Sequence, residues 1–282
     1  MNVSESIEML SSLRQWSPAT ILWYTEALAT VADLELTSLT PAVVEERLLA
    51  LPQNKWRDFL RFLRIICNWA VERGDLKENP VRCQPPRKNR APVHCWMDTK
   101  SCRKYLVAAD EVKNGLVCQI ALVTGLRRGE LMGLHLEDYE HPSIRVVRSL
   151  KRHKGEWITT DGKSTSSHRS VVVPGNYALA LDQHVQRKTE GPYIFSQPNG
   201  EPFAQWNLQR IHRRVLKKAK LPDMRFHDLR HSHAVMCLEN GVPMKAVQTR
   251  LGHSSYQITA DTYSHVSESY AKTVAEKLEE IL

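Results

Sequence analysis

The stretch Thr124-Gly-Leu-Arg-Arg-Gly-Glu-Leu131 places Arg127 at the start of a predicted helix that follows a glycine turn. A second stretch, His227-Asp-Leu-Arg-His-Ser-His-Ala234, sets His227 and Arg230 three residues apart, and therefore on one face of a helix. Both stretches present always-charged arginines next to turns or helix ends, where a guanidinium can reach an anion.

Two further stretches follow in the last third of the chain. Leu251-Gly-His-Ser-Ser255 ends a predicted helix at a glycine and presents His253, and Thr262-Tyr-Ser-His-Val266 offers Tyr263 just before the last helix. Taken singly, each residue has an ordinary structural explanation: Arg127 as a surface cation, His253 as a cap and Tyr263 as a half-buried aromatic. The occurrence of all four stretches in order favours a shared site.

The residues before this region predict a small all-α module. Ser17-Pro18 and Thr40-Pro41 have the form of an N-cap followed by proline at the first helical position, the first of them opening a helix that runs through Val31. A longer helix is predicted over about residues 54–73, with apolar side chains at spacings of three and four and a glycine at its end. The segment 82–95 then holds prolines and cations with little to bury, which indicates an extended linker.

Beyond the linker the pattern predicts a mixed α+β domain. The β-branched runs Ile144–Val147, Trp157–Thr160 and Ser170–Val173 indicate a three-stranded antiparallel sheet. No alternating βαβ rhythm is present, so the chain is expected to be mainly α with a small antiparallel sheet. Helices are predicted over about residues 98–110, 113–124, 127–135, 176–188, 205–219, 227–240, 243–251 and 267–281.

The distribution of charge points to a polyanionic partner. The chain has a formal net charge of +8, yet residues 1–81 carry 8 basic and 11 acidic residues. Within that acidic module Arg57, Arg61 and Arg64 lie on one stripe of the long helix. The stripe is either a solvated face or a surface that tracks phosphates.

Several other classes of protein find no support. No P-loop or G-x-G-x-x-G motif is present, and the histidines of residues 227–233 lack a metal-binding pattern, so neither a cofactor nor a metal is expected. No apolar run is long enough for a membrane span, and the first ten residues lack the features of a secretory signal. Six cysteines without a C-x-x-C pair fit reduced thiols, so we expect a cytoplasmic protein.

Together the four stretches closely resemble the tyrosine recombinase (phage integrase) family over about residues 98–270. The segment 162–174 also resembles the family's β-hairpin, with Lys163 as its lysine. The resemblance implies a core-binding (SAM-like) domain at residues 1–81, a basic linker at 82–95 and a catalytic domain at 96–282. It implies a site-specific DNA recombinase that cleaves and rejoins DNA through a 3′-phosphotyrosine, for the integration or excision of a phage or mobile element. A Xer-like chromosomal or plasmid resolvase, or less plausibly a type IB topoisomerase, is the alternative.

The resemblance also assigns roles to the residues. Arg127 and Arg230 would bind the scissile phosphate, Tyr263 would attack it, and Glu130 would orient Arg127. The remaining catalytic residues would be His227 as base, Lys163 as general acid and His253 as a hydrogen-bond donor. Arg128 and Arg169 match family positions without a distinct task. The predicted DNA contacts are Arg57, Arg61, Arg64, Arg82, Arg87, Lys88 and Arg90.

The predicted last helix suggests how copies of the chain assemble. Tyr270, Val274, Leu278 and Leu282 recur every four residues, so the helix is amphipathic. It either docks on its own domain or, as the resemblance implies, passes to a neighbouring protomer in a tetramer on DNA. Accessory DNA-bending or directionality factors are further expected partners. Many phage integrases begin with an additional arm-type DNA-binding domain, and none is visible before the predicted core-binding module. Either the integrase is of a short, simple kind or such a domain precedes this sequence. As a DNA-binding protein, the chain is expected to be nucleoid-associated.

Overall fold

The computed structural model describes residues 1–84, 96–153, 155–161, 168–252 and 279. The chain divides into two compact units, Met1–Ala91 and Pro92–Leu282. Their boundary falls inside the segment predicted as a linker. No helix in the described part of the chain is long and apolar enough to cross a membrane.

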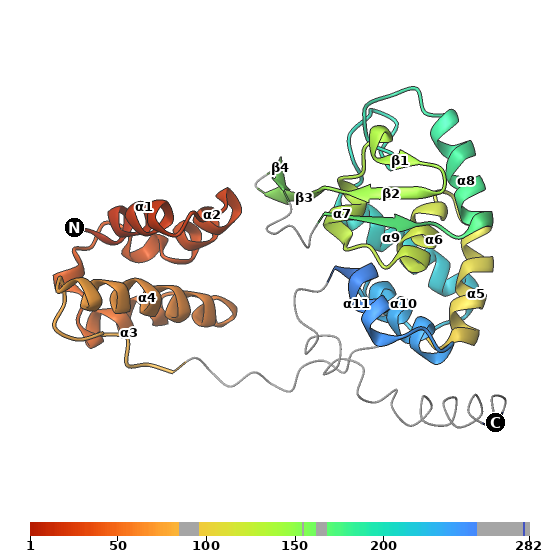
Figure 1. The fold of residues 1–282 in the computed structure, drawn as a ribbon. Helices are drawn as coiled ribbons and strands as arrows, with labels where there is room; N and C mark the ends of the chain where they lie inside the picture. Colours follow the sequence, from red (N-terminus) through yellow and green to blue (C-terminus); the bar gives the residue numbers. More distant parts are fainter. Residues whose placement is uncertain (85–95, 154, 162–167, 253–278, 280–282) are drawn as a thin grey trace. The chain divides into compact units, whose positions relative to one another are not determined.

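Over residues 1–84 the first unit has four α-helices and two short 3₁₀ helices, Ala29–Val31 and Leu36–Ser38 (Figure 1). The oxygens of Ser17 and Thr40 accept hydrogen bonds from backbone amides, and a proline follows each, as predicted. The helix that begins at Pro18 ends earlier than expected, because its last part tightens into the first 3₁₀ helix. The α-helices are α1 (Val3–Leu13), α2 (Pro18–Ala27), α3 (Pro41–Leu49) and α4 (Gln53–Arg73).

Helix α4 carries the core of the first unit. Phe59, Leu60, Leu63 and Ile66 are fully buried along one face, as the spacing of apolar residues predicted. The helix ends at Gly74, which has the left-handed conformation (φ 85°) that a glycine adopts without strain.

The second unit is also mainly helical. Helix α6 is buried from Val117 to Thr124 and forms its centre, so the end of α6 is a rigid support for the residues that follow. The helix predicted over 113–124 begins only at Leu116, and those predicted over 127–135 and 176–188 end early, at Met132 and Gln186. The helix predicted over 267–281 lies outside the described residues except for residue 279. The helices are α5 (Thr99–Asp110), α6 (Leu116–Thr124), α7 (Arg128–Met132), the 3₁₀ helix Leu136–Asp138, α8 (Gly175–Gln186), α9 (Gln205–Ala219), α10 (Asp228–Glu239) and α11 (Met244–Leu251).

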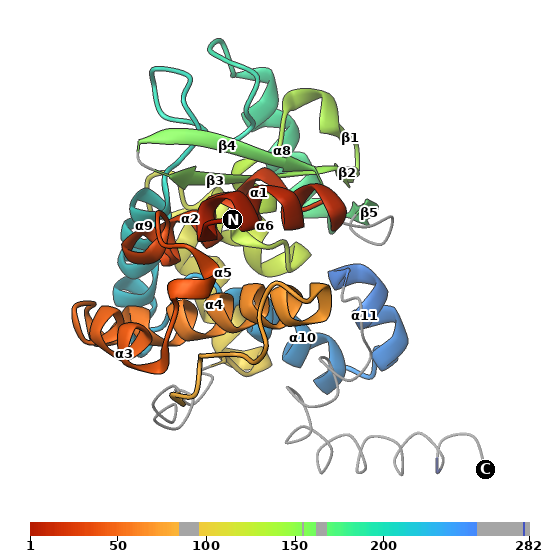
Figure 2. The same cartoon turned by 90° about the vertical axis from the view of Figure 1, so that its left-hand side faces the viewer.

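The strands form two sheets, where one was predicted. Strands β1 (Tyr139–Glu140), β2 (Ser143–Val146) and β5 (Arg169–Val172) make an antiparallel sheet in the order β1-β2-β5. Strands β3 (Arg148–His153) and β4 (Glu156–Asp161) make a separate hairpin, and both views show it beside the sheet (Figures 1 and 2). The prediction that Trp157–Thr160 joins the other two strands is therefore wrong. That run pairs with β3, a polar segment that sequence analysis did not recognise as a strand.

Candidate active site

Arg127 is placed by the end of helix α6. Gly125 has φ 67°, and a Cβ atom there would lie 2.6 Å from a Leu251 methyl and 2.7 Å from the His233 ring, so only glycine fits. The chain then enters α7 with Arg127 as its N-cap residue. Glu130 accepts hydrogen bonds from the Arg127 backbone amide (2.8 Å) and from its Nη1 (2.9 Å).

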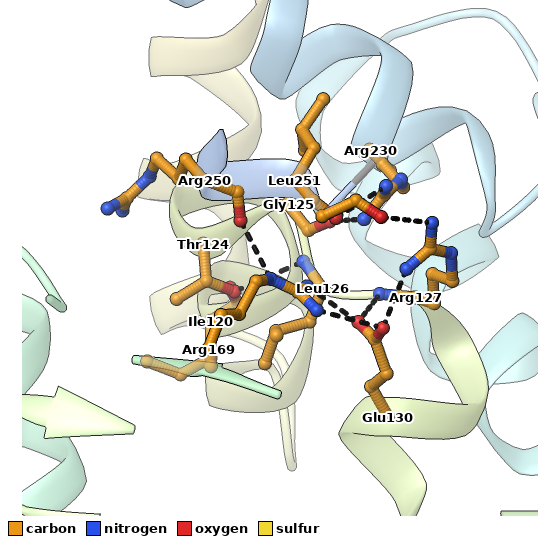
Figure 3. Close-up of polar contacts among 11 residues, drawn as sticks. Ile120, Thr124, Gly125, Leu126, Arg127, Glu130, Arg169, Arg230, Arg250 and Leu251 are labelled. Atoms are coloured by element: carbon orange, nitrogen blue, oxygen red, sulfur yellow. Dashed lines mark hydrogen bonds and ion pairs between the residues drawn. The ribbon is translucent and has the colours of Figure 1, made fainter. Parts of the chain in front are cut away.

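Arg230 reaches the same place from the first turn of α10. Its side chain is buried, with the residue only 4% exposed. Nη1 donates to the Gly125 carbonyl (2.7 Å), and Nη2 donates to the Leu251 carbonyl (2.8 Å). Arg127 Nη2 donates to the next carbonyl, that of Gly252, at 2.9 Å. The two arginines predicted to share a site therefore meet at the end of α11 (Figure 3).

Arg169, on β5, completes this cluster and was given no task by sequence analysis. It forms a two-pronged ion pair with Glu130, Nη1 to Oε1 at 3.1 Å and Nη2 to Oε2 at 2.8 Å. Its Nε donates to the Arg250 carbonyl at 2.9 Å. Glu130 therefore binds two guanidinium groups, from Arg127 and from Arg169.

The charge on Glu130 is stabilised by these partners. Burial alone would raise the pKa of this carboxyl group, but Arg169 and then Arg127 more than offset it, so the pKa lies below its ordinary value. Glu130 is therefore ionised at neutral pH and orients both cations.

His227 lies at the N-cap position of α10, and its residue is exposed. Its ring meets that of His231 edge-on at 5.5 Å. The surrounding protein desolvates the imidazole and Arg230 adds positive charge nearby, and both lower the pKa of His227. The ring is thus neutral at physiological pH, as a proton acceptor must be.

The other predicted residues differ in how far the structure describes them. Lys163, His253 and Tyr263 lie outside the described residues, and so do Arg87, Lys88 and Arg90. Arg82 is exposed and forms an ion pair with Glu78 at 2.6 Å.

The three arginines of α4 have different surroundings, and Arg57 is half-buried. Arg61 is exposed and lies 5.6 Å from the centre of the Phe62 ring. Arg64 is half-buried and donates to the carbonyls of Val81 (3.3 Å) and Cys83 (2.7 Å). It therefore holds the segment that leaves the first unit, whether or not it also meets a phosphate.

The described residues contain no group of histidine, cysteine and acidic side chains arranged to hold a metal ion. His233 is buried, and its ring forms a hydrogen bond with the Leu122 carbonyl at 2.8 Å. Its role is therefore structural and not that of a metal ligand. The described cysteines are free thiols: Cys67, Cys83, Cys102, Cys118 and Cys237.

Sequence analysis also missed a basic face on α9. Trp206 is 56% exposed on this helix, and the Arg210 guanidinium lies 5.2 Å from the centre of its ring. The sequence signal was a run rich in arginine and lysine on a helix with an apolar opposite side. The face comprises Gln205, Trp206, Gln209, Arg210, Arg213, Arg214 and Lys217.

Comparisons with known proteins agree with this architecture. Residues 96–269 match the model of the Phage integrase family. A "Tyrosine recombinase XerC-like" protein of Caldanaerobacter subterraneus subsp. tengcongensis is 29% identical over 78% of this chain, and the chain spans only 64% of its length. The ICEBs1 integrase of Bacillus subtilis is 26% identical over 89% of this chain and 72% of its own.

Solved structures show the same fold. A Tn1549 transposon integrase in complex with a circular intermediate DNA aligns with a TM-score of 0.76 over 99% of both chains, at 20% identity. A lambda integrase bound to a core site aligns with a TM-score of 0.59 over 92% of this chain and 97% of its own, at 19% identity.

The fold and the family match define a class: the chain belongs to the phage integrase family, that of the tyrosine recombinases. Members of this family are enzymes that cleave and rejoin DNA.

Proposed function

We propose that this chain is a site-specific DNA recombinase that cleaves and rejoins double-stranded DNA through a 3′-phosphotyrosine intermediate. The observation that carries the proposal is the meeting of Arg127 and Arg230 at the end of α11, each oriented by a backbone carbonyl. Together with family membership, this pair of fixed cations supports a site for a phosphodiester.

The two arginines supply electrostatic stabilisation. A phosphodiester under attack passes through a five-coordinate state whose non-bridging oxygens concentrate negative charge. Guanidinium groups are always protonated and bind such oxygens through two parallel N–H bonds. Because Arg127 and Arg230 are held before the substrate arrives, they stabilise that charge without reorganising.

Proton transfers complete the reaction. Tyrosine has a pKa near 10, so the Tyr263 hydroxyl must lose its proton to attack the phosphorus. Neutral His227 accepts that proton, and Lys163 protonates the leaving 5′-oxygen. His253 donates a hydrogen bond to the phosphate. The phosphoester is exchanged rather than hydrolysed, so the reverse attack by a 5′-hydroxyl reseals DNA without an energy source.

The DNA contacts extend over both units. On the second unit the basic face of α9 provides cations and an exposed tryptophan. The α4 stripe of Arg57, Arg61 and Arg64 contributes from the first unit, and the linker contributes the cations Arg82, Arg87, Lys88 and Arg90. Such cations bind the backbone through phosphate contacts, with affinity that falls as salt rises.

The active form is a tetramer on two DNA sites, in which a C-terminal helix passes between protomers. The biological role is the integration and excision of a mobile element, in line with the relative that is named as an integrase. A Xer-like resolvase is the alternative, in line with the relative that is named as XerC-like. Accessory DNA-bending or directionality factors belong to either role.

A covalent-capture experiment tests the reaction. The protein is incubated with a pool of nicked duplexes of random sequence, and DNA that stays attached in detergent is recovered and sequenced. We expect recovery of one site, attached through a 3′-phosphate to Tyr263.

Tyr263→Phe is the matched control. It lacks the attacking oxygen but keeps the phosphate contacts, so it should bind the recovered site with nearly unchanged affinity and form no adduct. An adduct formed equally well by Tyr263→Phe would contradict the assignment. Joining of two recovered sites separates a recombinase from a topoisomerase, which needs no partner site.

A further inference from the structure

The last turn of α11 presents three successive backbone carbonyls, and each accepts a hydrogen bond from a different arginine. The Arg250 carbonyl accepts from Arg169 (2.9 Å), that of Leu251 from Arg230 (2.8 Å) and that of Gly252 from Arg127 (2.9 Å). The last carbonyls of a helix have no partner within the helix and carry partial negative charge, so cations are favoured there. The position of this turn therefore determines where three guanidinium groups lie.

A second helix end faces this turn. At the end of α6 the carbonyl of Leu122 is bound by His233 (2.8 Å), that of Val123 by Arg250 (3.0 Å) and that of Gly125 by Arg230 (2.7 Å). Two helix C-termini with like partial charges thus lie next to each other, and side-chain donors join them.

The side chain of Arg250 does not point toward Glu130, unlike those of Arg127 and Arg169. Its carbonyl faces Arg169, whereas its guanidinium points away from Glu130 (Figure 3). Nη2 donates to the carbonyls of Val123 (3.0 Å) and Val172 (2.9 Å), and Nε donates to His233 Nε2 (3.2 Å). The side chain thereby connects α11 with α6, β5 and α10.

The hydrogen bonds of His233 determine its tautomer. Its Nδ1 faces a carbonyl oxygen, which can only accept, so the proton is on Nδ1 and Nε2 accepts from Arg250. Burial and then Arg250 lower the pKa of His233 to about 3, which keeps the ring neutral. No acidic side chain of the described residues pairs with Arg250, and burial lowers its pKa. Among the described residues the acceptors of this half-buried cation are all neutral, which is costly, and a merely structural contact could be made by an apolar side chain.

We propose that Arg250, together with His233, is a positioning residue for the three arginines. It holds the last turn of α11 against the last turn of α6 and β5, and so sets the carbonyls that orient Arg127, Arg169 and Arg230. Its effect on cleavage rests on the proposed function, which assigns Arg127 and Arg230 to the phosphate.

Single-turnover cleavage of the captured site by the whole 282-residue chain tests this effect. In such a reaction the amplitude reports the folded, active fraction, and the rate constant reports the site itself. Arg250→Met should lower the rate constant by about 10- to 100-fold, because displacement of catalytic groups by about 1 Å has effects of that size. The affinity for DNA should change by no more than about threefold, since the phosphate contacts elsewhere remain.

Matched variants separate positioning from folding. Lys245→Met removes an exposed cation of the same helix, whose Nζ donates only to Gln248 in the described structure, and it should leave the rate constant unchanged. His233→Phe should behave like Arg250→Met, whereas His233→Gln, which retains a donor and an acceptor, should lose less. If Arg250→Met lowers only the amplitude and the melting temperature, its role is structural and the proposal is wrong.

Arginine side-chain NMR gives a readout that needs no DNA. In the wild type the Nε–H of Arg169 and the Nη–H groups of Arg127 and Arg230 should exchange slowly with water, and Arg250→Met should speed that exchange about tenfold or more. Unchanged exchange would overturn the proposal. A wild-type protein that never forms a covalent adduct would instead contradict the proposed function, and the NMR comparison would still decide the role of Arg250.

Discussion

Glu130 is a buried carboxylate that two guanidinium groups share. Its replacement by glutamine leaves Arg127 and Arg169 without their anion, and removal of one partner from a buried ionic group costs about 3–5 kcal/mol. We expect Glu130→Gln to lower the free energy of unfolding at pH 7 by about that amount. Glu137→Gln, which removes an exposed carboxylate paired with Arg148, should cost less than about 1 kcal/mol.

The cost of Glu130→Gln should also depend on pH. Because the folded-state pKa of Glu130 is lowered, its ionic stabilisation is fully present above the ordinary value of 4.5 and disappears as the pH falls through the lower folded value. Urea unfolding of both proteins between pH 7 and pH 3 measures the difference. A difference that stays constant over this range would show that the lost contribution is not ionic.

The pH dependence of the cleavage rate should report the protonation of His227. A base must be neutral to accept the proton of Tyr263. Partial desolvation by the surrounding protein, and then the charge of Arg230, lower the pKa of His227. The single-turnover cleavage rate should therefore stay level as the pH falls toward 6.5 and decline only below it. His227→Gln should react slowly and lose this decline, whereas His141→Gln, an exposed histidine paired with Asp182, should retain it. A decline that persists in His227→Gln would assign it to another group.

The residues around the candidate site differ in how far their roles could be predicted from the sequence. Arg127, Glu130 and Arg230 were recognised because each lies in a short motif with its neighbours. Arg169 was seen but given no task, and Arg250 was passed over. Their contacts join β5 and α11 to segments 17 to 127 positions away, and no local pattern encodes such distances.

At the scale of elements the helices and the three β-branched strands were predicted within a few residues, but strands β1 and β3 and the pairing of the strands were not. The apolar spacing of α4 and the proline-headed starts of α2 and α3 are local signals, and the structure confirms them. Strand β3 has the sequence Arg-Ser-Leu-Lys-Arg-His and buries Leu150 as its one core residue, so it lacks the alternation of a half-buried strand. Without β3, the partner of β4 could not be identified.

The arginines of helices α4 and α9 are expected to bind DNA through phosphate contacts. Reversal of Arg210, Arg213 and Arg214 to glutamate should weaken DNA binding and reduce the slope of log K against log salt by about one for each lost phosphate contact. Arg57 and Arg61 of α4 should behave in the same way. Arg64 is a less clean test, because its loss also frees the Val81 and Cys83 carbonyls. Arg187→Glu, an exposed cation that follows α8, is the control, and an unchanged slope in the α9 variant would make that face an ordinary solvated surface.

At the scale of the whole molecule, the chain consists of two units with separate cores, joined through a segment of few apolar residues. The division into a core-binding domain, a linker and a catalytic domain stays a prediction, and the location of the unit boundary is consistent with it.

The predicted C-terminal helix is expected to join copies of the chain in a tetramer on DNA. Its predicted helix has Tyr270, Val274 and Leu278 on one stripe, and a head-to-tail contact through that stripe can close a ring of four. Such a ring would couple the tyrosines of neighbouring protomers and restrict which pair cuts. We expect a monomer in solution that becomes a tetramer on two sites, measured by light scattering with and without DNA. Deletion of residues 268–282 should spare the binding of one site but impair synapsis and recombination. If the shortened protein recombines two sites as well as the full chain, the helix docks on its own domain and the exchange does not occur.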